Sequence, residues 1–379
     1  MKGEQIPPDS YLLDVTVRSD TQNSYPLRIT LTKNERRTIM ACYHPLRGAY
    51  TNSLTDSGKR KVKVFPSATT GNKFVYQNRS KPDVFTTSDH LFDIGTWRKL
   101  DTFLIPCGQC IGCRLDYSRR WATRLMLELQ CHDSAFFVTL TYDDDHIKRG
   151  SKLAYTLDPG DIQLFLKRLR KEQSTRTDTK IRFFLAGEYG SQTHRPHYHL
   201  ILFDWIPPEN DLVFLKNSFS GNKYWYSLTL NKLWKYGYNV VADVCWKSCA
   251  YVARYILKKH KGTDSNVYED LGIYPEFSRM SRKPGIGKEY YDIHSKDMLK
   301  QGYVQLPDGM TAPIPRYFDP FFERDFPKQF AEMSENRVET AKMLQQIKEY
   351  SSELDYFEQL AIDEQSKQFK SRMLIRPEI

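Results

Sequence analysis

The order of apolar runs between residues 135 and 260 is the feature that most constrains the fold. AFFVTLTY, at residues 135–142, reads as a strand, and DIQLFLKRLRKE reads as an amphipathic helix with a basic face, capped by Asp158 or Asp161. Two further strands, KIRFFLAGEYG and PHYHLILFD, are joined by the polar link SQTHR and predict a hairpin. SCAYVARYILKKH is compatible with a second helix. This order predicts an α+β domain in which helices pack on an antiparallel sheet.

Composition and charge indicate a polyanionic partner. The 379 residues are 40% hydrophobic, enough for one large core or two modest ones. The net charge is +10, and residues 319–379 hold 13 acidic and 9 basic side chains, so residues 1–318 carry +14. A basic body of this kind attracts nucleic acid, although a merely soluble basic surface is an equal alternative.

Neither an export signal nor a membrane span is expected. The first residues, MKGEQIPPDSYLLDV, lack an apolar core of signal-peptide length, and no apolar run approaches the roughly 20 residues of a membrane span. Seven cysteines are an odd count, and three of them have CxxCxxC spacing. A full disulfide framework is therefore not expected, and a reducing cytoplasm is favoured.

Two histidines open the apolar strand PHYHLILFD. Because strand side chains alternate between faces, His197 and His199 point to the same face. Neutral imidazoles bind divalent metal ions, and Glu188 on the preceding strand is the natural third ligand, since the hairpin turn brings it beside them. A lone HxH motif is equally typical of packed or surface histidines, so other features must decide.

A tyrosine pair is the deciding feature. In YVARYILKK, Tyr251 and Tyr255 lie one helical turn apart, and Lys258 and Lys259 follow. A tyrosine hydroxyl has a reference pKa of about 10, so nearby cations and a metal that polarises the phosphoryl oxygen would make it a better nucleophile. Attack on a DNA phosphodiester would leave a 5′-phosphotyrosine and a free 3′-hydroxyl, and rejoining would need no ATP. Alone, such a pair more often packs than reacts, but the histidines, Glu188 and the basic body reverse that preference.

Together these motifs resemble a known family. FFVTLTYDDDH, GEYG followed by RPHYHLILF, YVARYILKK and MSRKPGIG occur in the order typical of microvirus replication initiators, particularly the gokushovirus type, within the HUH endonuclease superfamily. The resemblance covers roughly residues 100–318. It implies a ferredoxin-like antiparallel sheet, a divalent metal (Mg²⁺ or Mn²⁺), nicking of a phage origin and rolling-circle replication in the cytoplasm of a bacterial host. Implied partners are single-stranded and supercoiled origin DNA and the host helicase, single-strand-binding protein and DNA polymerase.

The resemblance also assigns roles to residues. His197 and His199 look like metal ligands and Tyr251 and Tyr255 like paired nucleophiles, whereas Glu188 has His194 and Asp143–Asp145 as alternatives. Gly285 and Gly287 of SRKPGIG would let backbone amides approach a phosphate, unless this is an ordinary surface turn. The expected DNA contacts are Thr141, Tyr142, Arg254, Lys258, Lys259, Arg282 and Lys283.

The segment PCGQCIGCR predicts a second, structural metal site. Cys107, Cys110 and Cys113 have the spacing of zinc ligands, with unpaired thiols in a turn as the alternative. Cys42 is the preferred fourth ligand, ahead of His44 and Cys131.

We expect three regions. Residues 1–100 form an N-terminal region of uncertain fold, residues 101–318 form the HUH endonuclease domain with CxxCxxC at its start, and residues 319–379 form an acidic helical tail. The heptad-like spacing of residues 343–361 favours a docked helix or a loose tail over a dimer zipper. No GxxxxGK[ST] loop is present, so unwinding would depend on the host. The alternatives are a zinc-containing nucleic-acid-binding protein without catalysis and an HUH relaxase or transposase.

Overall fold

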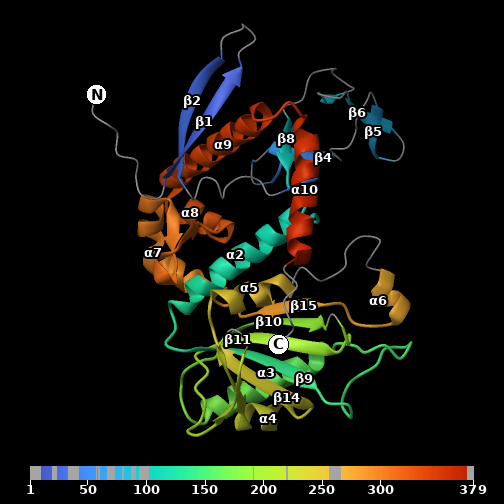
Figure 1. Ribbon diagram of the computed structural model, residues 1–379, viewed down its shortest axis with the longest axis vertical. Coiled ribbons are helices and arrows are strands. Elements are labelled where there is room, and N and C mark those ends of the chain that lie inside the picture. The colour runs from blue at the N-terminus through green and yellow to red at the C-terminus, as the bar shows by residue number, and fades with distance from the viewer. Residues whose placement is uncertain are drawn as a thin grey trace.

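The computed structural model describes the larger part of the chain (Figure 1). The described residues are 10–18, 24–32, 42–56, 58, 60–65, 73–78, 81–86, 91–93, 102–190, 192–218, 221–255 and 266–373. Lys258 and Lys259 lie outside these ranges, and for Tyr251, Arg254 and Tyr255 the description covers the backbone alone.

A seven-stranded sheet forms the centre of residues 135–280. Its strands are β9 (Ala135–Tyr142), β10 (Arg182–Tyr189), β11 (Pro196–Phe203), β12 (Leu212–Asn217), β13 (Lys223–Ser227), β14 (Gly237–Asp243) and β15 (Phe277–Met280). They are ordered β12-β13-β14-β9-β11-β10-β15, and every neighbouring pair is antiparallel. The predicted antiparallel sheet and the β10–β11 hairpin are confirmed, whereas β12, β13 and β15 were not predicted.

Helices cover both faces of this sheet. The four helices are α2 (Ile111–Leu129), α3 (Pro159–Ser174), α4 (Leu228–Trp234) and α5 (Trp246–Tyr255). Tyr198, Leu200 and Leu202 of β11 pack into the same apolar cluster as side chains of α3 and α4. Ile201 and Phe203 point the other way and pack with α2 and α5. In Figure 1, α5 lies between α2 and the strands β10 and β11.

The predicted helices are confirmed, with one N-cap decided. Asp158 caps α3, because its side chain accepts a hydrogen bond from the Gly160 amide. Asp161 is instead buried and accepts a hydrogen bond from the Tyr142 hydroxyl at 2.8 Å. The α2 helix begins at Ile111, because Cys110 Sγ accepts from the Cys113 amide and caps the first turn.

The remaining elements lie before and after this domain. They are β1 (Ser10–Arg18), β2 (Ser24–Thr32), β3 (Leu46–Leu54), β4 (Arg60–Phe65), β5 (Lys73–Asn78), β6 (Lys81–Thr86), β7 (Leu91–Asp93), β8 (Thr102–Ile105), α6 (Asn266–Leu271), α7 (Lys288–Gln301), β16 (Tyr303–Gln305), η2 (Pro307–Gly309), β17 (Thr311–Pro313), η3 (Arg316–Phe318), α8 (Asp319–Asp325), α9 (Pro327–Tyr350) and α10 (Tyr356–Met373). Among the described residues, no helix is both long enough and apolar enough to cross a membrane.

The acidic tail is helical and docks on the N-terminal region. The chain bends between α9 and α10, so the heptad-like spacing does not continue along one helix. Leu360 of α10 is buried, and His44 Nε2 lies 2.5 Å from Glu364 Oε2. Phe103 of β8 and Phe357 of α10 line one shared cavity. Of the two non-zipper expectations, the docked helix is the one that the structure has.

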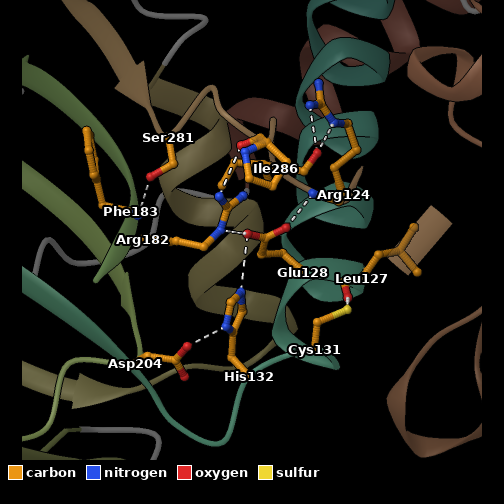
Figure 2. Close-up of polar contacts among 12 residues, drawn as sticks. Arg124, Leu127, Glu128, Cys131, His132, Arg182, Phe183, Asp204, Ser281 and Ile286 are labelled. Atoms are coloured by element: carbon orange, nitrogen blue, oxygen red, sulfur yellow. Dashed lines mark hydrogen bonds and ion pairs between the residues drawn. The ribbon is translucent and has the colours of Figure 1, made fainter. Parts of the chain in front are cut away.

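A buried polar network connects α2 to the SRKPGIG turn (Figure 2). The Glu128 carboxylate accepts hydrogen bonds from Arg182 Nε and from the Gly287 amide, both at 2.5 Å. His132 lies 3.3 Å from Glu128 Oε1 through Nε2 and 2.7 Å from Asp204 Oδ2 through Nδ1. Two segments far apart in sequence are thus held by one carboxylate.

This network corrects our interpretation of the glycines in SRKPGIG. The Gly287 amide donates to Glu128 and cannot cradle a phosphate. A Cβ at Gly285 would lie 2.3 Å from Tyr317 Oη, so this glycine allows close packing against Tyr317. Because Phe184 of β10 pairs with Met280, the turn that follows lies at the end of the sheet opposite to Glu188. The glycines therefore have a structural role, and Arg282 and Lys283 remain exposed.

The network predicts a pH-dependent contribution to stability. Burial would lower the pKa of His132, but hydrogen bonds to Glu128 and Asp204 outweigh burial and raise the pKa above its usual value. A raised folded-state pKa stabilises the fold fully below the unfolded pKa of about 6.5, and this stabilisation is lost as pH rises through the folded value. In urea unfolding, we expect His132→Gln to cost about 2 kcal/mol at pH 6 and clearly less at pH 9.

The surface variant His294→Gln is the control for this pH series. His294 lies 3.6 Å from Asp297 at the surface, so its replacement should cost under about 0.5 kcal/mol at both pH values. An equal cost of His132→Gln at both pH values would show that the imidazole contributes only as a neutral group.

Candidate functional site

Glu188 and His199 meet on one face of the central sheet. In the β10–β11 register, Glu188 lies opposite His197 and Ala186 lies opposite His199. His199 Nε2 is 2.8 Å from Glu188 Oε1, and these residues are only 4% and 3% exposed. The hairpin therefore places Glu188 beside the histidine pair, as the sequence predicted.

Two threonines of β9 orient the histidine rings. Thr139 Oγ1 lies 3.0 Å from His199 Nδ1, and Thr141 Oγ1 lies 3.1 Å from His197 Nδ1. When Nδ1 donates to a threonine hydroxyl, Nε2 keeps its lone pair, which is the form of imidazole that binds a metal ion. Thr139 was not predicted, and Thr141 was expected to contact DNA. The alternation of VTLTY is the signal that was available, but its use requires knowing that β9 pairs with β11.

The alternative ligands are held in other contacts. Asp143 Oδ1 lies 2.7 Å from His146 Nδ1, and Asp144 Oδ1 lies 2.6 Å from Arg195 Nη1. His194 is in the hairpin turn, where its amide donates to Gly190 O. Glu188 is therefore the acidic group that the described contacts connect to the pair.

The helix α5 covers the same face of the sheet. Its Cys249, Val252 and Ala253 are fully buried in the cluster that contains Ala186 and Ile201 of the strands that carry Glu188 and the histidines. Positions 251 and 255 are one turn apart on this helix. The backbone thus brings the tyrosine pair to the face that carries Glu188, His197 and His199.

Tyr198 and Tyr142 have a structural role on the opposite face. The Tyr198 hydroxyl accepts from the Asp158 amide at 2.8 Å and so holds the start of α3. Tyr142 is 1% exposed, and its hydroxyl lies 3.0 Å from that of Tyr198. Burial, together with the neighbouring Tyr198 and Asp161, raises the pKa of Tyr142 far above its usual value. The expected contact of Tyr142 with DNA does not fit this buried position.

Four cysteines form a second site at the start of α2. The Sγ atoms of Cys42, Cys107, Cys110 and Cys113 all lie within 4.8 Å of one another, and these are the residues that, among those described, form a group able to hold a metal ion. Amides of the loop donate to sulfur, including Cys107 N to Cys42 Sγ at 3.2 Å and Cys110 N to Cys107 Sγ at 3.3 Å. Such contacts stabilise thiolates at a metal site.

The fourth member of this group is Cys42, as preferred from the sequence. His44 instead contacts Glu364, and Cys131 Sγ donates to Leu127 O. Burial would raise the pKa of the Cys110 thiol, but amide hydrogen bonds from Cys113 and Tyr43 lower it to about 7. By contrast, burial raises the pKa of Cys42 to about 11. The cluster thus contains at least one thiol that ionises readily.

Comparison with known proteins identifies relatives among phage proteins. A family described as replication-associated proteins of the ORF2 type matches residues 135–260, from β9 to just beyond α5. Replication-associated protein VP4 of Bdellovibrio phage phiMH2K is 32% identical over 265 residues, covering 69% of this chain and 80% of that protein. Replication-associated protein ORF2 of Spiroplasma virus 4 is 33% identical over 269 residues, with 69% and 82% covered. Replication-associated protein ORF4 of Chlamydia phage 1 is 31% identical over 234 residues, with 60% and 56% covered. No solved structure matches the chain.

Proposed function

This chain belongs to the family of bacteriophage replication-associated proteins, and we propose that it initiates rolling-circle replication by nicking one strand of the phage origin through a tyrosine. One observation carries the proposal: α5, with Tyr251 and Tyr255, packs on the sheet face that carries Glu188, His197 and His199. A nucleophile pair and a candidate metal site on one face are what phosphoryl transfer to tyrosine requires.

His197, His199 and Glu188 are the proposed ligands of a Mg²⁺ or Mn²⁺ ion. Adjacent ligands of an octahedral cation, each about 2.1 Å from it, are about 3.0 Å apart, close to the 2.8 Å between His199 Nε2 and Glu188 Oε1. The threonine contacts at Nδ1 leave the Nε2 atoms as the donor nitrogens. When bound, the cation supplies positive charge that polarises a phosphoryl oxygen.

The proposed reaction is a reversible exchange of phosphodiesters. The hydroxyl of Tyr251 or Tyr255 loses its proton and attacks the phosphorus, the bond to the 3′-oxygen breaks, and that oxygen leaves as a hydroxyl. The 5′-phosphate remains esterified to the tyrosine, so a 3′-hydroxyl can later displace the tyrosine and rejoin the strand without ATP. A second tyrosine can attack another phosphodiester while the first is occupied.

Other features support an HUH-type replication enzyme. The strands β14-β9-β11-β10, numbered in chain order, lie in the order 4-1-3-2, with α3 connecting the first two strands, as in a ferredoxin-like β-α-β-β-α-β unit. Arg282 and Lys283 are exposed and are proposed to contact DNA phosphates, as are Arg254, Lys258 and Lys259. The proposed setting is the cytoplasm of the bacterial host, with supercoiled origin DNA and the host helicase, single-strand-binding protein and polymerase as partners.

The proposal is tested by trapping the covalent product. Purified protein is incubated with labelled single-stranded origin DNA and either Mn²⁺ or EDTA, and the products are separated on a denaturing gel. The expected result is a metal-dependent adduct that mass spectrometry of peptides assigns to Tyr251 or Tyr255. Tight DNA binding with neither adduct nor cleavage on any candidate origin would favour the non-catalytic nucleic-acid-binding protein instead.

We also propose that the four-cysteine group binds structural zinc. Four sulfur donors are typical of closed zinc sites, in which no position is left for substrate. The group joins the chain just before β3 to the first turn of α2. Such a site would stabilise this connection and would take no part in the nicking chemistry.

The threonines of β9 are predicted to tune metal affinity. Thr139→Val together with Thr141→Val removes both hydroxyls beside Nδ1, and loss of such outer contacts weakens metal binding by about 10–100-fold. We expect the Mn²⁺ concentration for half-maximal nicking to rise by this factor. The matched control is Thr139→Ser with Thr141→Ser, which keeps the hydroxyls. If the serine variant were impaired as strongly as the valine variant, the hydroxyl contacts would not be responsible.

A further inference from the structure

A row of paired residues extends the histidine face beyond the proposed metal site. Glu188 lies opposite His197, His197 opposite Thr141, and Thr141 opposite Tyr238 of β14. Directly opposite residues of antiparallel strands point to the same face, so all four side chains share one face. With strands about 4.8 Å apart, the Cα atoms of Tyr238 and His197 are about 10 Å apart.

Tyr238 is unusually exposed for an aromatic residue on a central strand. It is 63% exposed, whereas Tyr224 of β13, on the same face beside the other end of β14, is 8% exposed within the core. The difference arises because α2 and α5 cover the end of the sheet that carries Ala242, the partner of Tyr224. The end with Tyr238 remains open beside the proposed cleavage site.

The adjacent strands supply further groups of the same kind. Tyr226 of β13 is two residues beyond Tyr224, so it points to the same face, and it lies opposite Val213 on β12. Lys216 of β12 lies opposite Tyr224 and is exposed. Aromatic rings with a cation beside them are the features on which unpaired bases stack while the backbone is neutralised.

Carboxylates nearby do not oppose this use of the surface. The acidic turn after β9 adjoins this corner, since the Asp143 amide donates to Tyr236 O. Asp143 and Asp144, however, contact His146 and Arg195, so their charge is directed to those partners. The remaining surface offers an exposed ring in line with the phosphate-cleaving groups.

We propose that Tyr238 is a substrate-positioning residue that stacks on an unpaired base next to the scissile phosphate. The inference rests on the proposed function for the position of that phosphate, and on the strand register for the position of Tyr238. A stacked base would fix the DNA strand across the sheet, so that one particular phosphodiester reaches the tyrosines of α5. Tyr238 would then contribute to the choice of cleavage position as well as to affinity.

The test uses origin oligonucleotides in which 2-aminopurine replaces one base at a time. Binding is measured in EDTA with full-length protein carrying Tyr251→Phe and Tyr255→Phe, so that binding is separated from cleavage. We expect one position near the nick to be quenched by stacking. Tyr238→Ala should abolish this quenching and raise the dissociation constant about tenfold. Tyr238→Phe should retain both, because the ring and not the hydroxyl carries the interaction.

Tyr350→Ala is the matched control, since Tyr350 of α9 is 60% exposed and lies outside the sheet. Binding by Tyr238→Ala at the parent affinity would overturn the proposal, as would equal losses in the Phe and Ala variants or an equal loss in the Tyr350 control. An unchanged melting temperature of Tyr238→Ala excludes misfolding as the cause. If quenching depends on Tyr238 but the unsubstituted chain forms no tyrosine adduct, stacking holds and nicking fails. An adduct without Tyr238-dependent quenching means the reverse.

Discussion

The variant that carries Tyr251→Phe and Tyr255→Phe together is expected to bind origin DNA as tightly as the parent chain and to lose cleavage at least about 10³-fold. Phenylalanine keeps the ring but lacks the hydroxyl that would form the phosphoester. The fold should be unaffected, because α5 is anchored through Cys249, Val252 and Ala253. Cleavage is measured on a denaturing gel and binding by fluorescence anisotropy in EDTA.

The single variants make this result specific. If both tyrosines act as nucleophiles, Tyr251→Phe and Tyr255→Phe should each retain part of nicking or of strand transfer, and the adduct should move to the remaining tyrosine. A relaxase or transposase that uses one tyrosine would tolerate one of the two replacements fully. Tyr350→Phe, on the exposed surface of α9, controls for general effects. Persistent cleavage by the double variant would rule out both tyrosines.

Loss of the four-cysteine site is expected to have the second large effect. Cys42→Ser should remove the bound zinc and lower the free energy of unfolding by several kcal/mol, since structural zinc contributes directly to folding. The effect should be concentrated where the cluster joins the N-terminal strands to α2. Zinc content is measured by elemental mass spectrometry and stability by thermal unfolding with and without a chelator.

Cys245→Ser is the matched control, because Cys245 is exposed and lies outside the cluster. It should keep one zinc ion per chain and the parent melting temperature. A chelator should destabilise the parent and the Cys245→Ser variant but leave Cys42→Ser unchanged. If the parent chain contains no zinc, or if both cysteine variants melt alike, the cluster does not have the proposed role.

Local patterns were sufficient where the chain pairs with its near neighbours. The alternation of PHYHLILF and the short link before it determine both the face of His197 and its closeness to Glu188. The cluster of three cysteines could likewise be identified within one segment. Its fourth member, Cys42, was preferred among three candidates because nothing local distinguishes it, and only the fold brings it to the others.

Pairing between distant segments explains what the sequence did not reveal. Thr139 acquires its role only because β9 lies next to β11, and Tyr142 is buried because its face of that strand meets α3. The glycines of SRKPGIG resemble a phosphate-binding turn until Glu128, more than 150 residues earlier, is seen to occupy the Gly287 amide. Each of these depends on which surfaces pack together, and apolar periodicity does not specify that.

The two faces of β11 impose a constraint on how such proteins can diverge in length. His197 and His199 share the strand with Tyr198 and Leu200, which pack into the opposite core. Insertion of a single residue inside this strand would turn the imidazoles toward α3 and the apolar residues toward the tyrosine helix. Insertions in the link between β10 and β11 leave the facing unchanged if the pairing is kept. Evolutionary gaps among the phage relatives should therefore accumulate in that link and be absent from the strand itself.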